Sequence, residues 1–266
     1  MKRIEDILRD TQEWLLEVVS QWPSREITNS SRYEYLVDLD RLQAIILELS
    51  ERLGAADRAM VEAALGAYAE GTSQASVNLS GLTDDYARPL TSLLSSEPYL
   101  RRSSLAGARV MEEMKGFSGQ GAKDLARVLM AGIQEGLNPR KVAKDVIEQF
   151  SQAKTRAERI ARTEINMALR RGRLDEEQDA QERLGIKSGM LWASALRSTT
   201  RPSHARRHGR VYTIEEVRDF YSRDANAINC MCAQTSVLLD ENGQPTSKRA
   251  ISRMSKKREE YERSNL

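Results

Sequence analysis

The chain has 266 residues, of which 40% are hydrophobic, 5% aromatic and 30% charged. It has 15 glycines and 6 prolines, which is few, and it is rich in the helix-favouring residues Ala, Leu, Glu, Arg and Lys. This composition excludes an all-β sandwich or barrel. It predicts a mainly α-helical protein, long enough for one large domain or two modest ones.

No apolar run approaches the roughly 20 residues that a membrane span needs. The first residues also lack the apolar stretch and the cleavage site of a signal peptide. We therefore expect a soluble protein that is made in the cytosol and has no membrane partner.

The charges are distributed unevenly along the chain. Residues 1–150 carry 18 basic and 23 acidic side chains, whereas residues 151–266 carry 23 basic and 16 acidic ones. An acidic first half and a basic second half predict different partners, and nucleic acid is a candidate for the second.

Apolar residues at spacings of three and four predict amphipathic helices in the first 71 residues. Three are expected: residues 3–22 closed by Pro23, residues 31–53 ended by Gly54, and a helix from Ala56 towards Gly71. Residues 72–81 are rich in Ser, Thr, Asn and Gly and predict a loop. We interpret residues 1–100 as a helical domain that docks on a protein partner through its acidic surface.

Further helices are predicted after residue 116. Gly116 to Gly121 suggest a short flexible loop before a helix. Gly136 is expected to end this helix. Asn138 and Pro139 are typical of the N-cap and the first turn of the next helix. A longer helix is predicted over residues 154–184, and Gly185 is expected to end it.

The character of the sequence changes after Gly185. Short runs of β-branched and apolar residues predict strands at Met190–Trp192, Val211–Tyr212 and Val237–Leu239. Residues 101–240 would then form a second domain, and residues 241–266 a basic tail. The predicted fold class is mainly α, with an N-terminal helical domain followed by a helical plus small α+β C-terminal domain.

The only two histidines and two cysteines of the chain lie close together in sequence. His204 and His208 have the spacing H-x3-H, and Cys230 and Cys232 have the spacing C-x-C. Two imidazoles and two thiolates are the donor set of a structural zinc site, so zinc is a candidate cofactor. In the alternative interpretation the cysteines are small buried apolar side chains and the histidines lie in a polar loop.

Basic residues form two candidate DNA-binding clusters. Between residues 197 and 210 there are five arginines and no acidic residue: Arg197, Arg201, Arg206, Arg207 and Arg210. The tail adds Lys248, Arg249, Lys256, Lys257 and Arg258. Such side chains bind phosphate without reading base sequence. In the alternative interpretation the arginines form a solvated loop or pair internally with Glu215, Glu216 and Asp219.

Motifs of phosphate-binding loops, serine-hydrolase elbows and zinc-protease helices are absent from the sequence. Glu164 stands near Arg162 and could act as a base, although a glutamate on an arginine-rich helix more often forms ion pairs. We therefore expect no catalytic residue and no enzyme. The rival hypothesis is a metal-dependent nuclease or other hydrolase that uses His204, His208, Cys230, Cys232 and Glu164.

An ordered set of short motifs resembles the phage Mu F-like minor head proteins, which are also called head morphogenesis proteins. The residues that carry the resemblance are Arg162, Thr163, Glu164, Trp192, His204, Gly209, Asn229, Cys230 and Cys232. The similarity covers about residues 105–235.

The resemblance implies a structural virion protein of a tailed bacteriophage. Such a protein would act at the portal vertex in capsid assembly and in DNA packaging or ejection. Its implied partners are the portal protein, the capsid and, without sequence preference, the packaged DNA. Its implied location is the capsid interior or the portal vertex of the virion, and the host cytoplasm during assembly.

Overall fold

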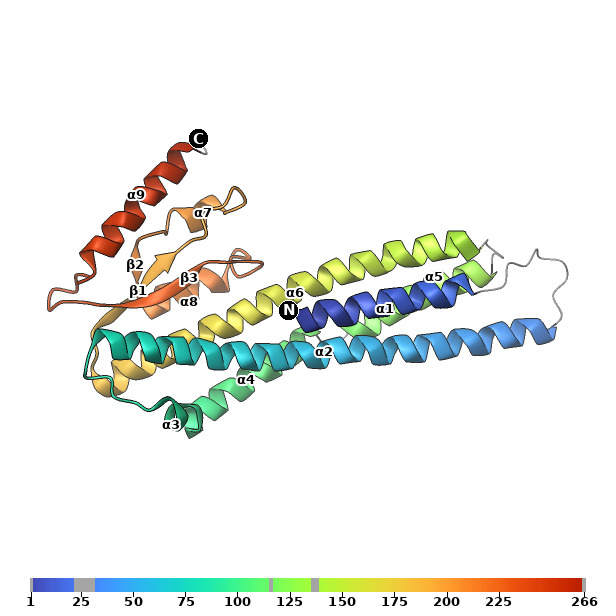
Figure 1. The fold of residues 1–266 in the computed structure, drawn as a ribbon, viewed down its shortest axis with the longest axis horizontal. Coiled ribbons are helices and arrows are strands. Elements are labelled where there is room, and N and C mark those ends of the chain that lie inside the picture. Colours follow the sequence, from blue (N-terminus) through green and yellow to red (C-terminus); the bar gives the residue numbers. More distant parts are fainter. Residues whose placement is uncertain (1, 22–31, 115–116, 135–138, 265–266) are drawn as a thin grey trace. The chain divides into compact units, whose positions relative to one another are not determined.

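The computed structural model of the chain describes residues 2–21, 32–114, 117–134 and 139–264 (Figure 1). It confirms the predicted fold class, because long helices are combined with a single three-stranded sheet over the described residues. In chain order the elements are α1 (Lys2–Ser20), α2 (Arg32–Leu82), α3 (Leu90–Leu94), α4 (Glu97–Met114), α5 (Phe117–Gln134), α6 (Pro139–Leu184), β1 (Ser188–Ala193), α7 (Pro202–Ala205), β2 (Val211–Tyr212), α8 (Ile214–Ser222), β3 (Ala233–Leu238) and α9 (Lys248–Ser264).

The chain forms two compact units, each built from two separate stretches. Unit 1 contains Met1–Ala63 and Gly107–Arg162, and unit 2 contains Ala64–Ala106 and Thr163–Leu266. The helices α2, α4 and α6 each contribute residues to both units. This division differs from the sequential boundaries suggested above, and a boundary at residue 100 would fall inside α4. The docking role of the first hundred residues stays a prediction.

The helix α2 corrects two expectations. It is continuous from Arg32 to Leu82, so Gly54 does not end it and residues 72–81 are not a loop. The polar side chains that suggested a loop donate to backbone carbonyls instead: Thr72 to Tyr68, Ser80 to Ser76 and Asn78 to Ser236. Hydrogen bonding and packing in unit 2 therefore override the local turn preference of these residues.

The helix α6 is also longer than expected. One helix runs from Pro139 to Leu184, where the sequence suggested two. Pro139 is its first residue and Gly185 follows its last at a positive φ of 67°, as predicted. The helix α5 already begins at Phe117, so residues 117–121 are helical and not the loop that was expected. Gly121 is buried, and a Cβ atom there would lie 3.5 Å from Leu53 in unit 1. Six residues invoked above lie outside the described residues: Trp22, Pro23, Ser31, Gly116, Gly136 and Asn138.

Two glycines allow α2 and α6 to cross closely within unit 2. A Cβ atom at Gly71 would collide with the backbone carbonyl of Leu169, and one at Gly172 would collide with that of Tyr68. Only glycine permits this approach of two backbones. The crossing fixes the part of α6 that leads into the sheet.

The sheet has the strand order β2-β1-β3, with both pairings antiparallel. Leu191 on the central strand pairs with Val211 on one side and Thr235 on the other. All three predicted strands form, although β3 begins at Ala233, earlier than expected. The sheet and α8 enclose a buried cluster: Leu174, Met190, Trp192, Ile214, Val217 and Phe220.

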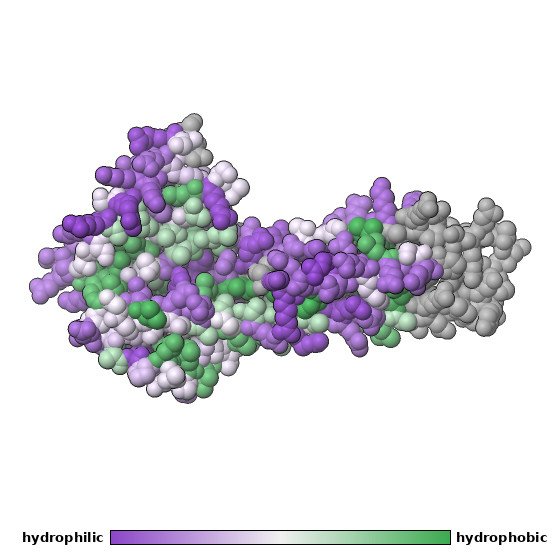
Figure 2. Space-filling model, viewed as in Figure 1, coloured by the Kyte–Doolittle hydropathy of each residue, from purple (hydrophilic) through white to green (hydrophobic). Residues whose placement is uncertain are grey.

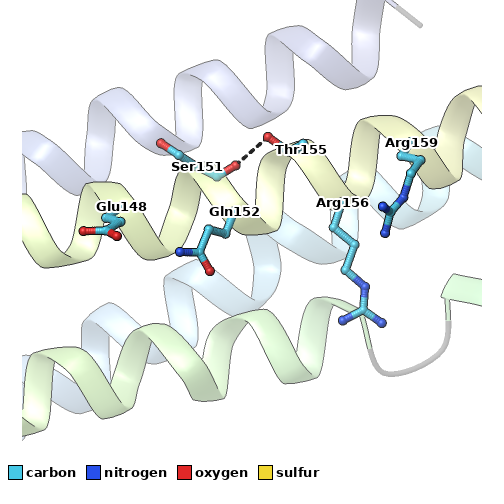
Figure 3. Close-up of a pocket in the computed structure, with 6 residues that line it drawn as sticks. All are labelled: Glu148, Ser151, Gln152, Thr155, Arg156 and Arg159. Carbon is cyan, nitrogen blue, oxygen red and sulfur yellow. Dashed lines mark hydrogen bonds between the residues drawn. The ribbon is translucent and has the colours of Figure 1, made fainter.

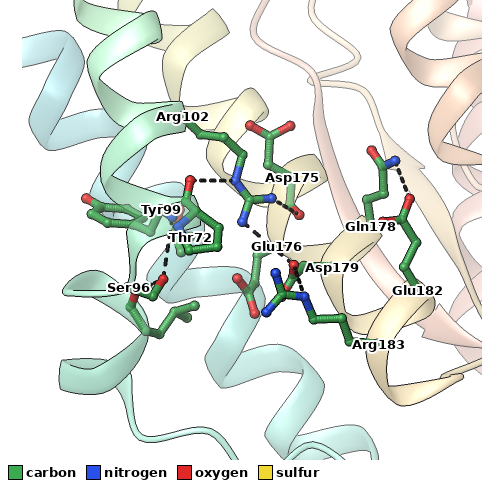
Figure 4. Close-up of polar contacts among 12 residues, drawn as sticks. Thr72, Ser96, Tyr99, Arg102, Asp175, Glu176, Gln178, Asp179, Glu182 and Arg183 are labelled. Atoms are coloured by element: carbon green, nitrogen blue, oxygen red, sulfur yellow. Dashed lines mark hydrogen bonds and ion pairs between the residues drawn. The ribbon is translucent and has the colours of Figure 1, made fainter.

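Charged side chains join α6 to α4 and to the segment before it in unit 2. Figure 4 shows Arg102 of α4 beside Asp175 and Asp179 of α6. The Arg88 guanidinium lies 3.1 Å from the Glu176 carboxylate and 2.5 Å from that of Asp179. Figure 4 shows that Arg183 also reaches Asp179, at 3.0 Å. The Tyr86 hydroxyl donates to Glu176 at 2.6 Å. Because both carboxylates are buried, these partners are required for α6 to pack here.

Figure 2 shows mostly hydrophilic residues over α9, in which no residue is buried. Over the part of the chain that the structure describes, none of the helices has an apolar stretch long enough to cross a bilayer.

Candidate functional site

Three of the four predicted metal ligands come together in unit 2. His204 lies on the short helix α7, Cys230 in the segment between α8 and β3, and Cys232 directly before β3. The Nδ1 atom of His204 is 3.4 Å from the Sγ of Cys230 and 3.4 Å from the Sγ of Cys232. The three ligand atoms all lie within 4.8 Å of one another. We call these three residues the His/Cys cluster.

His208, the fourth predicted ligand, is not part of the cluster. Its Nδ1 atom accepts a hydrogen bond of 3.0 Å from the backbone N–H of Ser194. Burial lowers the pKa of His208, and the positive charges of Arg258 and Lys257 act in the same direction. The imidazole of His208 is therefore neutral at pH 7, and its role is to hold the chain after β1.

Asn226 fixes the orientation of the His204 ring. The Asn226 amide nitrogen donates to the Phe220 carbonyl at 2.9 Å, so its oxygen is the atom that lies 3.3 Å from Nε2 of His204. An amide oxygen only accepts, and Nε2 must therefore carry the proton. The Nδ1 atom consequently presents its lone pair to both sulfurs. No sequence signal pointed to Asn226.

The Cys230 sulfur lies among hydrogen-bond donors. The backbone N–H of Cys232 donates to it at 3.4 Å. Gln234 donates to the Tyr221 hydroxyl, which leaves that hydroxyl free to donate to Cys230 at 3.5 Å. Hydrogen bonding to Cys232 lowers the pKa of the Cys230 thiol, and the same hydrogen bond together with burial raises that of Cys232. Of the two thiols, Cys230 is therefore the one that loses its proton more readily.

Two residues of α6 contact the segment that carries Cys230. Thr163 on α6 accepts a hydrogen bond of 3.0 Å from the backbone N–H of Asn229, and Asn166, three residues later, donates to the Cys230 carbonyl at 3.1 Å. Glu164 is buried, at 6% exposed, and Arg162 is the last residue of unit 1. Sequence reasoning missed Asn166, although its spacing from Thr163 places both on one helix face.

Trp192 and Gly209 connect the cluster to the sheet and to α9. The indole of Trp192 is fully buried and stacks on Tyr221 with ring centroids 5.2 Å apart. Gly209 has a positive φ of 77°, and a Cβ there would lie 2.9 Å from the Cβ of Met254 on α9. Both the positive φ and the lack of room for a Cβ atom therefore require glycine at this position.

Three of the five loop arginines have contacts within unit 2. Arg201 donates to three backbone carbonyls at 2.9–3.0 Å: those of Ala225, Asn226 and Ile228. The Arg207 guanidinium lies over the ring of Phe220 at 3.9 Å and over that of Tyr212 at 4.6 Å. Arg197 reaches the Met231 sulfur at 3.5 Å. These three arginines therefore contact backbone carbonyls, aromatic rings and a thioether. The alternative interpretation had named Glu215, Glu216 and Asp219 as their partners.

The predicted basic tail is largely a helix, α9. Arg258 on α9 donates to the His208 carbonyl at 2.6 Å, and the Tyr261 hydroxyl donates to the Arg197 carbonyl at 2.9 Å. The remaining predicted DNA contacts are exposed, and no carboxylate of the described residues lies within ion-pair distance of them: Arg206, Arg210, Lys248, Arg249, Lys256 and Lys257. We call these six residues the basic set.

With Asn226, the cluster forms a Cys230–His204–Asn226 arrangement, a combination of side chains that some thiol hydrolases also use. However, His204 is 2% exposed and Cys230 is 3% exposed. Cys230 is therefore almost closed to solvent, whereas Cys232 is half-buried.

A hollow of about 600 Å³ lies on α6 in unit 1 (Figure 3). Its lining residues all come from this helix: Glu148, Ser151, Gln152, Thr155, Arg156 and Arg159. Figure 3 shows the Thr155 hydroxyl donating to the Ser151 carbonyl, at 2.9 Å.

A comparison with protein families matches residues 123–235 to the family described as Phage Mu protein F like protein. No match was found among the curated proteins or among the solved structures. The matched segment contains the whole His/Cys cluster, the residues that orient it and the arginine-rich loop. The chain is therefore similar to this family over residues 123–235.

Proposed function

We propose that this chain is a head morphogenesis protein of a tailed bacteriophage. In this proposal it is a structural minor head protein of the virion that acts at the portal vertex, in capsid assembly and in DNA packaging or ejection. The observation that carries the proposal is the family match over residues 123–235. The burial of His204 and Cys230 supports a role without catalytic turnover.

Exposed acidic residues on unit 1 supply a surface for the protein partner. On α1, the carboxylates of Glu5 and Glu13 are exposed, and no ion pair involves them among the described residues. The opposite face of α1 buries Ile4, Leu8 and Leu15. Carboxylates presented in this way attract a basic partner and steer its association.

Charge reversal of α1 tests this partner surface. Full-length protein carrying Glu5→Lys and Glu13→Lys should be incorporated into phage heads several-fold less than the native chain, measured by quantitative immunoblot of purified heads. A matched variant with Asp84→Lys and Glu241→Lys reverses two exposed acids of unit 2 and should be incorporated normally. Normal incorporation of the α1 variant would exclude this surface, and absence of the native chain from portals and heads would exclude the proposed function.

The basic set supplies the contact with packaged DNA. Its side chains are exposed cations, and the hydrogen bond from Arg258 to the His208 carbonyl holds α9 beside the arginine-rich loop. Contacts of this kind bind phosphate in any sequence and release counterions, so the affinity depends strongly on salt.

Two substitutions in the loop test the DNA contact. Arg206→Ala with Arg210→Ala should weaken binding of a fluorescent duplex equally for unrelated sequences and reduce the salt slope by about 1 for each lost contact. Arg223→Ala, which removes a cation paired with Asp219, is the matched control and should leave affinity unchanged. If the double variant keeps both its DNA affinity and its salt dependence, this loop does not contact DNA. Cleavage of the duplex by the native protein would contradict a role without turnover.

A further inference from the structure

We propose that His204, Cys230 and Cys232 bind one zinc ion through three protein ligands: Nδ1 of His204 and the two Sγ atoms. This inference concerns the fold of residues 186–240 and does not depend on the function proposed above. It differs from the four-ligand site that the sequence suggested, because His208 is not a ligand.

The two sulfur–nitrogen distances fit a tetrahedral zinc site. Zinc lies about 2.3 Å from a thiolate sulfur and about 2.0–2.1 Å from an imidazole nitrogen, which places such ligands about 3.6 Å apart. Both sulfurs are 3.4 Å from Nδ1. One nitrogen lone pair accepts only one hydrogen bond, whereas a metal on that lone pair contacts both sulfurs at once.

The surroundings of the three ligands are those of a metal site. Asn226 fixes the proton on Nε2 of His204, as outer residues commonly do for a metal-bound imidazole. The Cys230 sulfur has two donors, the backbone N–H of Cys232 and the Tyr221 hydroxyl, that favour a thiolate. Cys232 packs against the cluster that contains Trp192, whose buried indole N–H has no acceptor among the described residues. A metal-bound thiolate at Cys232 would be such an acceptor.

The charge and the donor atoms of the site also favour a divalent metal that binds sulfur and nitrogen. Two thiolates neutralise one zinc ion, so a buried site of this composition carries no net charge. Nitrogen and sulfur donors select zinc over magnesium or calcium. Cys232 is half-buried, whereas the other two ligands are buried, so solvent supplies the fourth ligand from the side of Cys232.

Metal content tests the site directly. Full-length protein purified without chelator should contain about one zinc per chain, measured by mass spectrometry of the metal. Cys232→Ser should lose most of this zinc, and Asn226→Ala should bind it 10–100-fold more weakly. His208→Gln is the matched control, because it removes the other histidine and should retain zinc.

Cobalt substitution gives a second readout that does not depend on mutant folding. Native protein stripped of metal and titrated with Co²⁺ should show the intense visible bands of a tetrahedral site and the near-ultraviolet bands of thiolate ligands. Saturation at one equivalent supports the proposal. Folded native protein that contains no zinc and gives no such bands would overturn it, and so would loss of zinc from the His208→Gln variant with retention by Cys232→Ser.

Discussion

Arg206 and Arg207 are adjacent in sequence but have different environments. Arg206 is exposed, whereas the Arg207 guanidinium lies over the rings of Phe220, Tyr212 and Trp192. A desolvated cation over an aromatic face contributes up to about 2 kcal/mol. Stability and DNA affinity should therefore depend on different arginines of the same loop.

Alanine at each position separates the two roles. Arg207→Ala should lower the free energy of unfolding by about 1–2 kcal/mol through the lost ring contacts. Arg206→Ala should change it by less than about 0.5 kcal/mol, as expected for an exposed side chain. Urea unfolding followed by fluorescence measures both, and equal stabilities for the two variants would show that the ring contacts contribute nothing.

Glu177 is a buried carboxylate that joins α6 to the sheet. It is 0% exposed and accepts hydrogen bonds from the hydroxyls of Ser188 on β1 and Ser236 on β3. Burial raises the pKa of Glu177 above the ordinary 4.5, despite these two hydrogen bonds. The folded state therefore binds this proton more tightly than the unfolded chain. Its stabilising effect is complete below about pH 4.5 and is lost as the pH rises through the raised value.

Glu177→Gln should remove this pH dependence. At about pH 7.5 the variant should be more stable than the native chain, because no charge has to be buried, and the difference should shrink towards about pH 5. Urea midpoints at the two pH values measure this. Glu182→Gln, on the exposed side of the same helix, should give no pH-dependent difference. A Glu177→Gln variant less stable at about pH 7.5 would contradict the argument.

At the scale of the elements, the crossing of α2 and α6 is set by Gly71 and Gly172. Each lacks room for a Cβ atom, because a backbone carbonyl of the other helix occupies that space. Gly66, one turn and a half earlier on α2, has no atom within 4 Å of the same position. Glycine is therefore needed for close packing at residue 71 but not at residue 66.

Alanine substitutions test the crossing. Gly71→Ala or Gly172→Ala should lower the free energy of unfolding by at least about 1–3 kcal/mol, because the backbones must move apart. Gly66→Ala should raise it by about 0.5–1 kcal/mol, since alanine favours an exposed helix. Thermal melting followed by circular dichroism measures all three, and a stabilised Gly71→Ala variant would show that the helices do not cross as described.

At the scale of the whole molecule, each unit depends on two distant stretches of the chain. In unit 2, Leu79 and Tyr86 from the first stretch form one buried cluster with Ala180 and Ile186 from the second. The carboxylates of Glu176 and Asp179 also depend on Arg88. Residues 101–266 alone would leave this apolar surface exposed and would deprive the buried Glu176 carboxylate of Arg88 and Tyr86.

Two truncated variants test whether unit 2 needs its first stretch, with Trp192 fluorescence as the measurement. The chain has three tryptophans, and removal of residues 1–22 or 1–100 leaves Trp192 as the only one. Deletion of residues 1–100 should abolish the cooperative unfolding of Trp192, because loss of a buried ion-pair partner alone costs about 3–5 kcal/mol. Deletion of residues 1–22 removes only unit 1 residues and should leave the Trp192 midpoint unchanged. A normal Trp192 transition after the longer deletion would show that unit 2 folds from its second stretch.

The sequence by itself determined the features that depend on neighbours along the chain. Apolar periodicity predicted the helices, short runs of β-branched and apolar residues predicted three strands, and Gly185 was identified as a helix end. The rarity of histidine and cysteine singled out the donors of the candidate site. These signals are local, so they can be read without knowing the fold.

Only the tertiary structure decided which of those donors meet. His208 is one helical turn from His204 in sequence, yet its Nδ1 bonds to the Ser194 backbone, and Asn226 orients the ring instead. The continuity of α2 past Gly54 was equally invisible, because packing supplied by distant residues outweighs a weak local propensity. The physical reason is the same in each case: contacts between residues far apart in sequence are fixed by the packing of the sheet and the long helices, and no local pattern encodes their distance.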